Sequence, residues 1–218
     1  MSRLMKAGAN NLHRSWLNVP HVTQFDEADI TELEAFRKSM KAEAESQGAK
    51  LTPLPFMIKA CAYALRKFPQ FNVSLKGDGD TLVWKKYVHI GIAVDTPDGL
   101  FVPVLRDVAN RAPEDLRAGL DHLRRDVEQR KIPAKELQGA TLTLSNFGPL
   151  GGRYATPVVV PPQVAIVGAG KRFTQPGIRN GALFEDMQLP VSVTFDHRAL
   201  NGGQAARFLA ALLADLAL

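Results

Sequence analysis

Apolar and polar residues alternate along residues 191–196, and a period of two residues is typical of a β-strand. One face of this strand would carry valine and phenylalanine, and the other would carry serine, threonine and aspartate. His197 follows in phase with the apolar face, whereas Asp196 points the opposite way. The pattern therefore predicts a strand that leads into a buried His197.

Apolar residues three or four positions apart predict helices over much of the remaining chain. Thr31-Glu-Leu-Glu34 has the form of a capping box, so one helix is expected to begin at Thr31 and to end before Gly48. A proline at 53 or 55 is compatible with the first turn of another helix. The predicted helices are 3–16, 31–47, 53 or 55 to 65, 114–131 and the segment that follows Asn201.

Further strands are predicted by short apolar runs between turn signals, and these runs are 22–25, 87–94, 100–105, 140–145 and 163–168. Gly77-Asp-Gly-Asp80 and Thr96-Pro-Asp-Gly99 have turn-forming compositions. Helices interleaved with six or more strands predict an α/β fold, a mixed β-sheet covered by helices on one face as a two-layer sandwich. No repeat or linker interrupts the pattern, so residues 1–218 are expected to form a single domain.

The composition excludes several functional classes. The chain has 45% hydrophobic and 22% charged residues, which is typical of a soluble globular protein, and it has no apolar run of the roughly 18 residues that a membrane span requires. The net charge of +5 comes from basic residues spread along the chain, so nucleic acid is not an expected partner. Cys61 is the single cysteine, which excludes an internal disulfide and fits a reducing compartment.

His197 begins the pattern His-x-x-x-Asn-Gly, and an amphipathic segment follows directly. An isolated histidine on an apolar face is more often a structural residue than a catalytic base. The longer segment from Asp196 to Gly202, Asp-His-Arg-Ala-Leu-Asn-Gly, resembles the Asp-His-Arg-x-x-Asp/Asn-Gly signature of dihydrolipoamide acyltransferase catalytic domains. Those domains form the cores of 2-oxo acid dehydrogenase complexes, and the shorter pattern is shared by coenzyme-A-dependent acyltransferases.

The resemblance extends over essentially all 218 residues. Residues 11–25 are similar to the opening of the acetyltransferase cores of pyruvate dehydrogenase complexes, and residues 91–104 match the wider family. The family implies a chloramphenicol-acetyltransferase-like fold and a homotrimer, with trimers that assemble into a hollow cage. It also implies that residues 1–218 are one acyltransferase catalytic domain, without the lipoyl and peripheral-subunit-binding domains of longer family members.

The resemblance implies roles for three residues of one active site. His197 would act as general base, Ser145 would donate a hydrogen bond to the oxyanion of the tetrahedral intermediate, and Asn201 would position groups by hydrogen bonding. Ser145 and His197 would come from neighbouring subunits of the trimer. Much of the family has Asp where Asn201 stands, and Asn cannot carry a charge, although it both donates and accepts hydrogen bonds.

Two candidate residues also have ordinary structural explanations. The strand with Ser145 runs into a glycine-rich loop, where a hydroxyl often satisfies a turn, and its surroundings do not match the hydrolase pattern Gly-x-Ser-x-Gly. Arg37 lies with Lys38 and Lys41 on one predicted helix, where charged residues ordinarily form a solvated face. The resemblance instead assigns Arg37 to the phosphates of coenzyme A, with which a guanidinium pairs well.

The remaining motifs do not indicate a second site. Gly168-Ala-Gly-Lys171 lacks the third glycine of a dinucleotide fingerprint and the spacing of a Walker loop, so it is interpreted as a strand end and a turn. The other histidines, at 13, 21, 89 and 122, have no partner at metal-ligand spacing, and no metal is expected. Packing is the simplest role for His21 and His89.

The reaction implied by the resemblance is acetyl transfer between coenzyme A, as acetyl-CoA, and a dihydrolipoyl group carried by a domain outside this chain. The implied partners are further copies of the chain, the dihydrolipoyl domain, and the decarboxylase and dihydrolipoamide dehydrogenase components. The expected location is the bacterial cytoplasm rather than a mitochondrial matrix. Several alternatives stay open. They are a succinyltransferase, a branched-chain acyltransferase, a transferase with a small-molecule acceptor, and a structural core without catalysis. The stretch 151–157 partly resembles the branched-chain enzymes.

Overall fold

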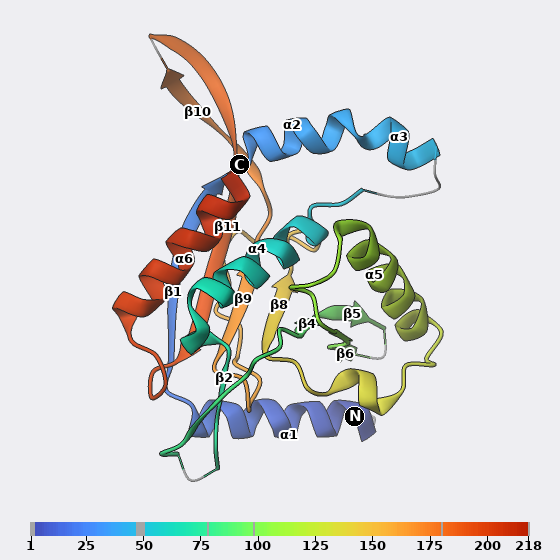
Figure 1. The fold of residues 1–218 in the computed structure, drawn as a ribbon, viewed down its shortest axis with the longest axis vertical. Coiled ribbons are helices and arrows are strands. Elements are labelled where there is room, and N and C mark those ends of the chain that lie inside the picture. Colours follow the sequence, from blue (N-terminus) through green and yellow to red (C-terminus); the bar gives the residue numbers. More distant parts are fainter. Residues whose placement is uncertain (1–2, 47–50, 78, 98, 180, 218) are drawn as a thin grey trace.

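The polypeptide folds around a seven-stranded mixed β-sheet (Figure 1). The structure is a computed structural model that describes residues 3–46, 51–77, 79–97, 99–179 and 181–217. The strand order is β1-β11-β9-β8-β4-β7, and β10 forms a hairpin with the long strand β11. The strands of this sheet are β1 (His21–Asp29), β4 (Ile90–Ile92), β7 (Val104–Leu105), β8 (Leu142–Asn146), β9 (Ala165–Ala169), β10 (Phe173–Arg179) and β11 (Ala182–Asp196).

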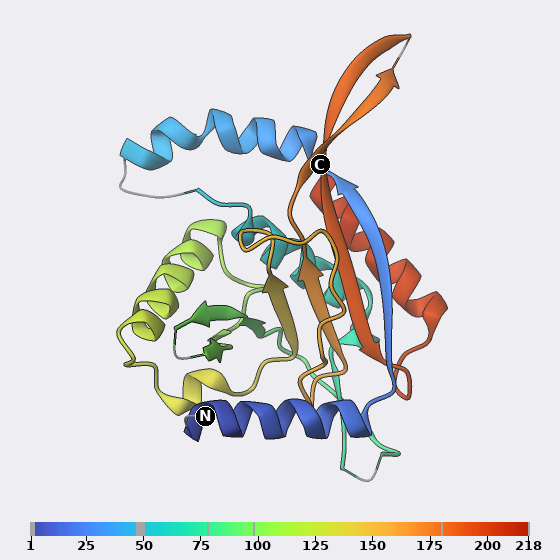
Figure 2. The same ribbon diagram turned by 180° about the vertical axis from the view of Figure 1, so that it is seen from behind.

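Helices cover one face of the sheet, as the sequence pattern predicts. α4 (Leu54–Lys67) and α6 (Gly202–Ala217) lie side by side across that face in Figures 1 and 2. The extended segment 147–163 runs over the opposite face, in front of β8 and β9 in Figure 2. The other helices are α1 (Arg3–Asn18), α2 (Thr31–Ser39), α3 (Lys41–Ser46), α5 (Pro113–Glu128) and the short 3-10 turns η1 (Pro69–Phe71) and η2 (Ala134–Leu137). Both faces of the central strands are therefore covered.

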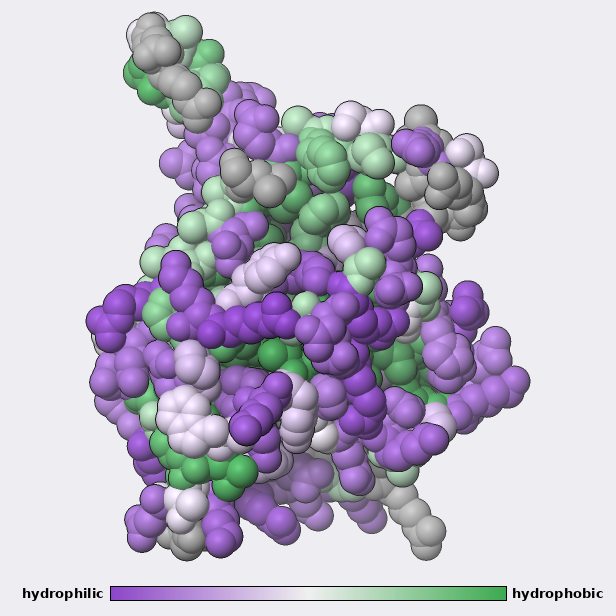
Figure 3. All heavy atoms as spheres, in the orientation of Figure 1, coloured by the Kyte–Doolittle hydropathy of each residue, from purple (hydrophilic) through white to green (hydrophobic). Residues whose placement is uncertain are grey.

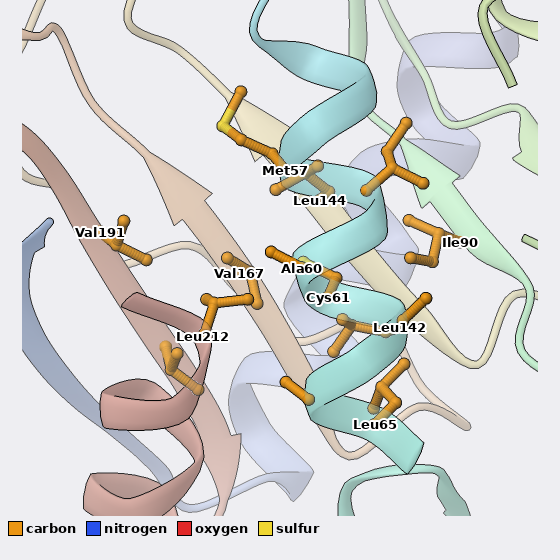
Figure 4. Packing of buried hydrophobic residues seen from close by; sticks show 14 of the residues in the cluster. Met57, Ala60, Cys61, Leu65, Ile90, Leu142, Leu144, Val167, Val191 and Leu212 are labelled. Atoms are coloured by element: carbon orange, nitrogen blue, oxygen red, sulfur yellow. The ribbon is translucent and has the colours of Figure 1, made fainter. Parts of the chain in front are cut away.

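Helix α4 joins the helical layer to the sheet through a continuous apolar side (Figure 4). Ala60 and Cys61 are small enough for close approach to the sheet, while Met57 and Leu65 fill the space beside them. Full burial of one large aliphatic side chain contributes about 1.5–3 kcal/mol. The residues that pack with this side of α4 in the same apolar cluster are Ile90, Leu142, Leu144, Val167, Val191 and Leu212. Burial raises the pKa of the Cys61 thiol to about 12, so this cysteine stays protonated and unreactive.

Two small hairpins lie outside the main sheet and confirm the predicted turns. β2 (Val73–Leu75) pairs with β3 (Leu82–Trp84) around the 77–80 turn, and β5 (Val94–Thr96) pairs with β6 (Gly99–Phe101) around the 96–99 turn. Asp78 and Asp98 themselves lie outside the described residues.

The predicted strands 87–94 and 100–105 are each shorter than expected and divided. The first becomes β4 and β5, which belong to different sheets, and the second becomes β6 and β7. Pro103 lies between β6 and β7 and has no amide hydrogen with which to continue a ladder. A continuous apolar run therefore did not indicate one continuous strand.

The predicted helix 31–47 is divided into α2 and α3 at Met40, and Gln47 and Gly48 lie outside the described residues. The predicted capping box is wrong. The N-cap is Ile30, and the Asp29 carboxylate accepts hydrogen bonds from the amide and the hydroxyl of Thr31 at 3.0 and 2.6 Å. The Glu34 side chain is thereby left for ion pairs elsewhere.

The hairpin of β10 and β11 is missing from the sequence predictions. It extends away from the body of the molecule, next to the helix α2 (Figures 1 and 2). Pro176 and Gly177 interrupt the apolar alternation of this stretch, which hides the strand. The Asn180-Gly181 dipeptide between the two strands is a strong hairpin signal and could have revealed it.

Candidate active site

His197 lies in a turn immediately after β11 and is exposed, so the prediction that its ring is buried is wrong for the single chain. The strand ends at Asp196, and the alternation cannot be continued past that residue. Ser192, Thr194 and Asp196 are all buried, because segment 147–163 covers the face that was expected to be polar and solvated. With both faces covered, alternation does not indicate which side is the interior.

The turn around His197 is held by its two neighbours. The Arg198 guanidinium donates hydrogen bonds from Nε and Nη2 to the two oxygens of the buried Asp196 carboxylate, at 3.0 and 2.7 Å. This hydrogen bonding raises the pKa of Arg198. The His197 amide donates to the Pro20 carbonyl at 3.0 Å. The imidazole therefore projects from a rigid backbone, and among the described residues its ring nitrogens have no hydrogen-bond partner.

Asn201 caps the helix α6. The Gln204 amide donates to Asn201 Oδ1 at 2.9 Å, and the Asn201 amide donates to Gln204 Oε1 at 2.8 Å, which is a reciprocal capping box. Asp and Asn are both strong N-caps, so either residue preserves this local structure. The Nδ2 group takes no part in the cap. Asn201 is thus fixed at the start of α6, four residues after His197, with an amide donor still available.

Ser145 lies near the end of β8, half-buried and level with Gly168 of β9. Among the described residues its hydroxyl has no hydrogen-bond partner, so the alternative role of satisfying a turn is not supported. A Cβ on Gly170 would lie 2.0 Å from the Arg153 carbonyl oxygen, and a Cβ on Gly148 would lie 2.4 Å from the Gly170 oxygen. The Gly168–Lys171 motif is the end of β9, as predicted, but the predicted turn is absent, because the Gly170 amide donates to the Pro190 carbonyl and the chain continues along β11. Its glycines leave room for the loop after Ser145.

Ser145 and His197 lie at opposite ends of the sheet. β8 runs parallel to β9, and β11 runs antiparallel to both. Ser145 is level with Gly168 and Ser192, while Asp196 lies four residues further along β11. This corresponds to roughly 16 Å between the Cα atoms of Ser145 and Asp196, with His197 beyond. We call these the serine end and the histidine end of the sheet.

The loop after Ser145 is attached to two strands by side chains that sequence analysis did not identify. The Arg153 guanidinium lies 3.7 Å from the centre of the Phe173 ring at the base of β10. The Tyr154 hydroxyl donates a hydrogen bond to the Glu27 carboxylate on β1, which raises the pKa of Tyr154. No motif marks these contacts, because each joins residues far apart in the sequence.

Arg37 lies in an internal ion-pair network at the serine end. Glu34 is 4% exposed, and its carboxylate pairs with Arg37 at 2.9 Å and with Arg172 at 2.5 Å. Arg37 also donates to the Leu51 carbonyl at 3.1 Å. Burial by itself would raise the pKa of Glu34, but the hydrogen bond from Arg37 and the charges of both arginines lower it overall. The network ties α2 to the base of β10, and the assignment of Arg37 to coenzyme A phosphates stays a prediction.

Replacing Glu34 by glutamine is expected to destabilise the protein by about 2–3 kcal/mol near neutral pH, because two arginines lose a buried anionic partner. The folded-state pKa of Glu34 is lowered, so its stabilisation is present above its ordinary pKa and is lost as the pH falls through the folded value. The difference between wild type and variant should therefore shrink in acid. Urea unfolding at neutral and acidic pH measures it, with the exposed Glu32→Gln as the matched control. Equal effects of the two substitutions would contradict the role of Glu34.

The other histidines do not form a second site. His21 Nδ1 lies 2.7 Å from the Val19 carbonyl, and its Nε2 accepts a hydrogen bond from the Val159 amide, while His89 Nδ1 accepts one from the Asp107 amide. These contacts confirm structural roles for His21 and His89. His13 and His122 are exposed on helices. Within the described ranges, no three His, Cys, Asp or Glu side chains are grouped to hold a metal, and none of the helices is both long and apolar enough to cross a membrane.

A family model described as 2-oxoacid dehydrogenases acyltransferase (catalytic domain) matches residues 1–216. The chain belongs to this family. Two acyltransferase relatives are the dihydrolipoyllysine-residue acetyltransferase components of the pyruvate dehydrogenase complexes of Azotobacter vinelandii, 53% identical, and Pseudomonas aeruginosa, 52% identical, each over 220 residues. The alignments cover 99% of this chain but 34% and 40% of those proteins. The chain thus spans well under half the length of the curated relatives it matches.

Solved structures of the acyltransferase family share the whole fold. One describes the cubic core of a pyruvate dehydrogenase multienzyme complex, with 52% identity, a TM-score of 0.96, and coverage of 100% of this chain and 89% of the other. A second, with the same values, comes from an investigation of the catalytic mechanism of the Azotobacter vinelandii dihydrolipoamide acetyltransferase. A chloramphenicol acetyltransferase is 15% identical with a TM-score of 0.60, covering 95% and 94% of the two chains. The predicted chloramphenicol-acetyltransferase-like fold is confirmed.

Proposed function

We propose that this chain transfers an acetyl group between coenzyme A and a dihydrolipoyl group, as the core of a pyruvate dehydrogenase complex. The observation that carries the proposal is the exposed His197 imidazole on a hydrogen-bonded turn, with ring nitrogens that have no partner among the described residues and with the helix-capping Asn201 four residues later. The Azotobacter vinelandii investigation concerned a serine, a histidine 52 positions later and an asparagine four positions after that. Ser145, His197 and Asn201 have the same spacing, which supports their assignment to one catalytic site.

The proposed site requires two copies of the chain. A general base and an oxyanion donor must both lie within about 3 Å of the reacting atoms, whereas Ser145 and His197 lie at opposite ends of one sheet. The serine end of one copy therefore meets the histidine end of the next. Repeated head-to-tail contacts close into a ring when the rotation permits, and a homotrimer is such a ring. The cubic core described for a relative supports assembly of trimers into a cage.

The proposed chemistry needs one base and one hydrogen-bond donor. A ring nitrogen of His197 takes the proton from the thiol of one substrate, a transfer that is uphill by roughly 2.7 kcal/mol for ordinary groups. The thiolate attacks the thioester carbonyl carbon of the other substrate, and the Ser145 hydroxyl donates a hydrogen bond to the oxyanion. The carbon–sulfur bond to the leaving group then breaks, and His197 returns the proton to the departing thiolate. The same residues serve both directions because both substrates are thiols.

The finer assignments belong to the same proposal. Arg37 would bind a coenzyme A phosphate through guanidinium hydrogens that are not engaged by Glu34 and Leu51. The dihydrolipoyl group, decarboxylase and dihydrolipoamide dehydrogenase would be supplied by other parts of the complex. Bacterial relatives at 52–53% identity support a location in the bacterial cytoplasm.

Steady-state transfer from acetyl-, succinyl- and isobutyryl-CoA to dihydrolipoamide tests the proposal. We expect kcat/KM to be at least about tenfold higher for the acetyl donor, because pockets discriminate between acyl groups of different size by this order. A preference for succinyl- or isobutyryl-CoA would replace the acetyl assignment. The branched-chain alternative rests on the sequence of residues 151–157. This stretch includes Tyr154, whose hydroxyl contacts Glu27. No transfer from any donor would favour a purely structural core.

A further inference from the structure

The outer part of the β10–β11 hairpin exposes a pair of large apolar side chains. Ile178 and Leu183 are cross-strand partners near its tip, and they are 74% and 83% exposed. Figure 3 shows apolar residues at this tip, well away from the body of the molecule. A two-stranded hairpin is only marginally stable without further packing. The exposed pair therefore indicates a surface that becomes covered.

The hairpin is packed across its two strands and attached at its base. A Cβ on Gly177 would lie 2.6 Å from the Phe184 ring, so the glycine makes room for this ring across the two strands. At the base, Phe173 contacts Arg153 and the neighbouring Arg172 pairs with Glu34 of α2. The base of the hairpin is thus attached to the loop after Ser145 and to α2.

The hairpin leaves the sheet at the serine end. β11 passes level with Ser145 at Ser192 and continues outward to the hairpin, in the direction opposite to His197. At this end the proposed function requires the histidine end of another copy. The hairpin therefore points toward that second copy.

The histidine end carries a matching apolar surface on α1. Trp16 and Leu17 are 64% and 68% exposed in its last turns, and Leu12 is 48% exposed. Of residues 5–18 in this helix, Ser15 is the one that is buried. A helix of this length is marginal in water without tertiary contacts. The Pro20 carbonyl just beyond α1 accepts the His197 amide hydrogen bond, so this surface lies beside the catalytic turn.

We infer that the hairpin tip of one copy, formed by Ile178 and Leu183, packs on α1 of the copy that supplies His197. The inference rests on the proposed function, because that function brings the two ends together. Both surfaces are apolar. The hairpin tip lies at the serine end of the sheet, and the α1 surface lies at the histidine end. The hairpin would hold the neighbour in the orientation that completes the site.

The double substitution Ile178→Asp and Leu183→Asp tests the contact. We expect loss of the trimer and larger assemblies in light scattering, and a fall in acetyl transfer of about tenfold or more at assay concentrations. The matched control is Leu100→Asp on β6, where the leucine is 58% exposed. An unchanged circular dichroism spectrum separates lost assembly from misfolding. Intact trimers with full activity in the tip variant would overturn the inference and leave the proposed function standing.

Cross-linking identifies the partner surface. A Leu183→Cys and Leu17→Cys double variant treated with a short bismaleimide should give covalently linked chains, and neither single variant should. The natural Cys61 does not interfere, because it is buried and its thiol has a pKa raised to about 12. Absence of linkage in an assembled double variant would overturn the contact with α1. This readout does not depend on activity, so it also holds if the wild type transfers no acetyl group.

Discussion

Replacing His197 by alanine is expected to lower kcat for acetyl transfer from acetyl-CoA to dihydrolipoamide by about 10²–10⁴-fold. The variant has no group to take the thiol proton, and the protonated thiol is a poor nucleophile. Its assembly should be unchanged, because the turn is held by Asp196, Arg198 and the backbone amide of residue 197 rather than by the imidazole. Initial rates at saturating concentrations of both substrates measure the effect.

His122→Ala is the matched control, since this histidine is exposed on α5. It should retain wild-type activity, and light scattering should show the same particle size for both variants. Near-normal turnover in the His197 variant would remove this residue from the mechanism. A smaller particle would instead indicate that the imidazole contributes to the contact between copies.

Replacing Ser145 by alanine is expected to lower kcat by roughly 10²–10³-fold with little change in KM, because the hydroxyl is needed only when negative charge develops on the oxygen. The variant should also complement the His197 variant. When the two are coexpressed, about one site in four would combine an intact serine from one copy with an intact histidine from the next.

The coexpressed mixture should therefore recover about a quarter of wild-type activity, far above either variant alone. Mixing the two proteins after separate purification is the control, because assembled particles should exchange copies slowly. No recovery in coexpressed particles shown by mass spectrometry to contain both variants would mean that each copy completes its own site. A Ser145 variant altered only in KM would contradict the oxyanion role.

The parts of this structure that could be predicted from the sequence depend on local patterns. The helix at 54–67 and the strands around 142–146 and 165–169 follow from apolar spacing. Short motifs and a family resemblance point to His197, Ser145 and Asn201, whose roles stay predictions. The capping box of Asn201 with Gln204 also has a local sequence signature, a polar N-cap residue followed three positions later by glutamine.

The parts that could not be predicted depend on contacts between distant segments. His197 is exposed because β11 ends at Asp196 and because segment 147–163 covers the sheet face opposite the helices. The alternation of apolar and polar residues along β11 indicates neither of these features. Glu34 fits a capping box locally, but Arg172, 138 residues away, engages its carboxylate instead. The separation of Ser145 from His197 requires the order and direction of strands, and one sequence does not specify these.

The opposed directions of β8 and β11 have a consequence for the life of the protein in the cell. If two copies share each active site as proposed above, an unpartnered copy carries half of each of two reaction centres and does not turn over thioesters by itself. On that proposal catalysis begins when copies associate, and dilution below the dissociation constant of the ring stops it. The strand arrangement would then couple the onset of catalysis to completed assembly.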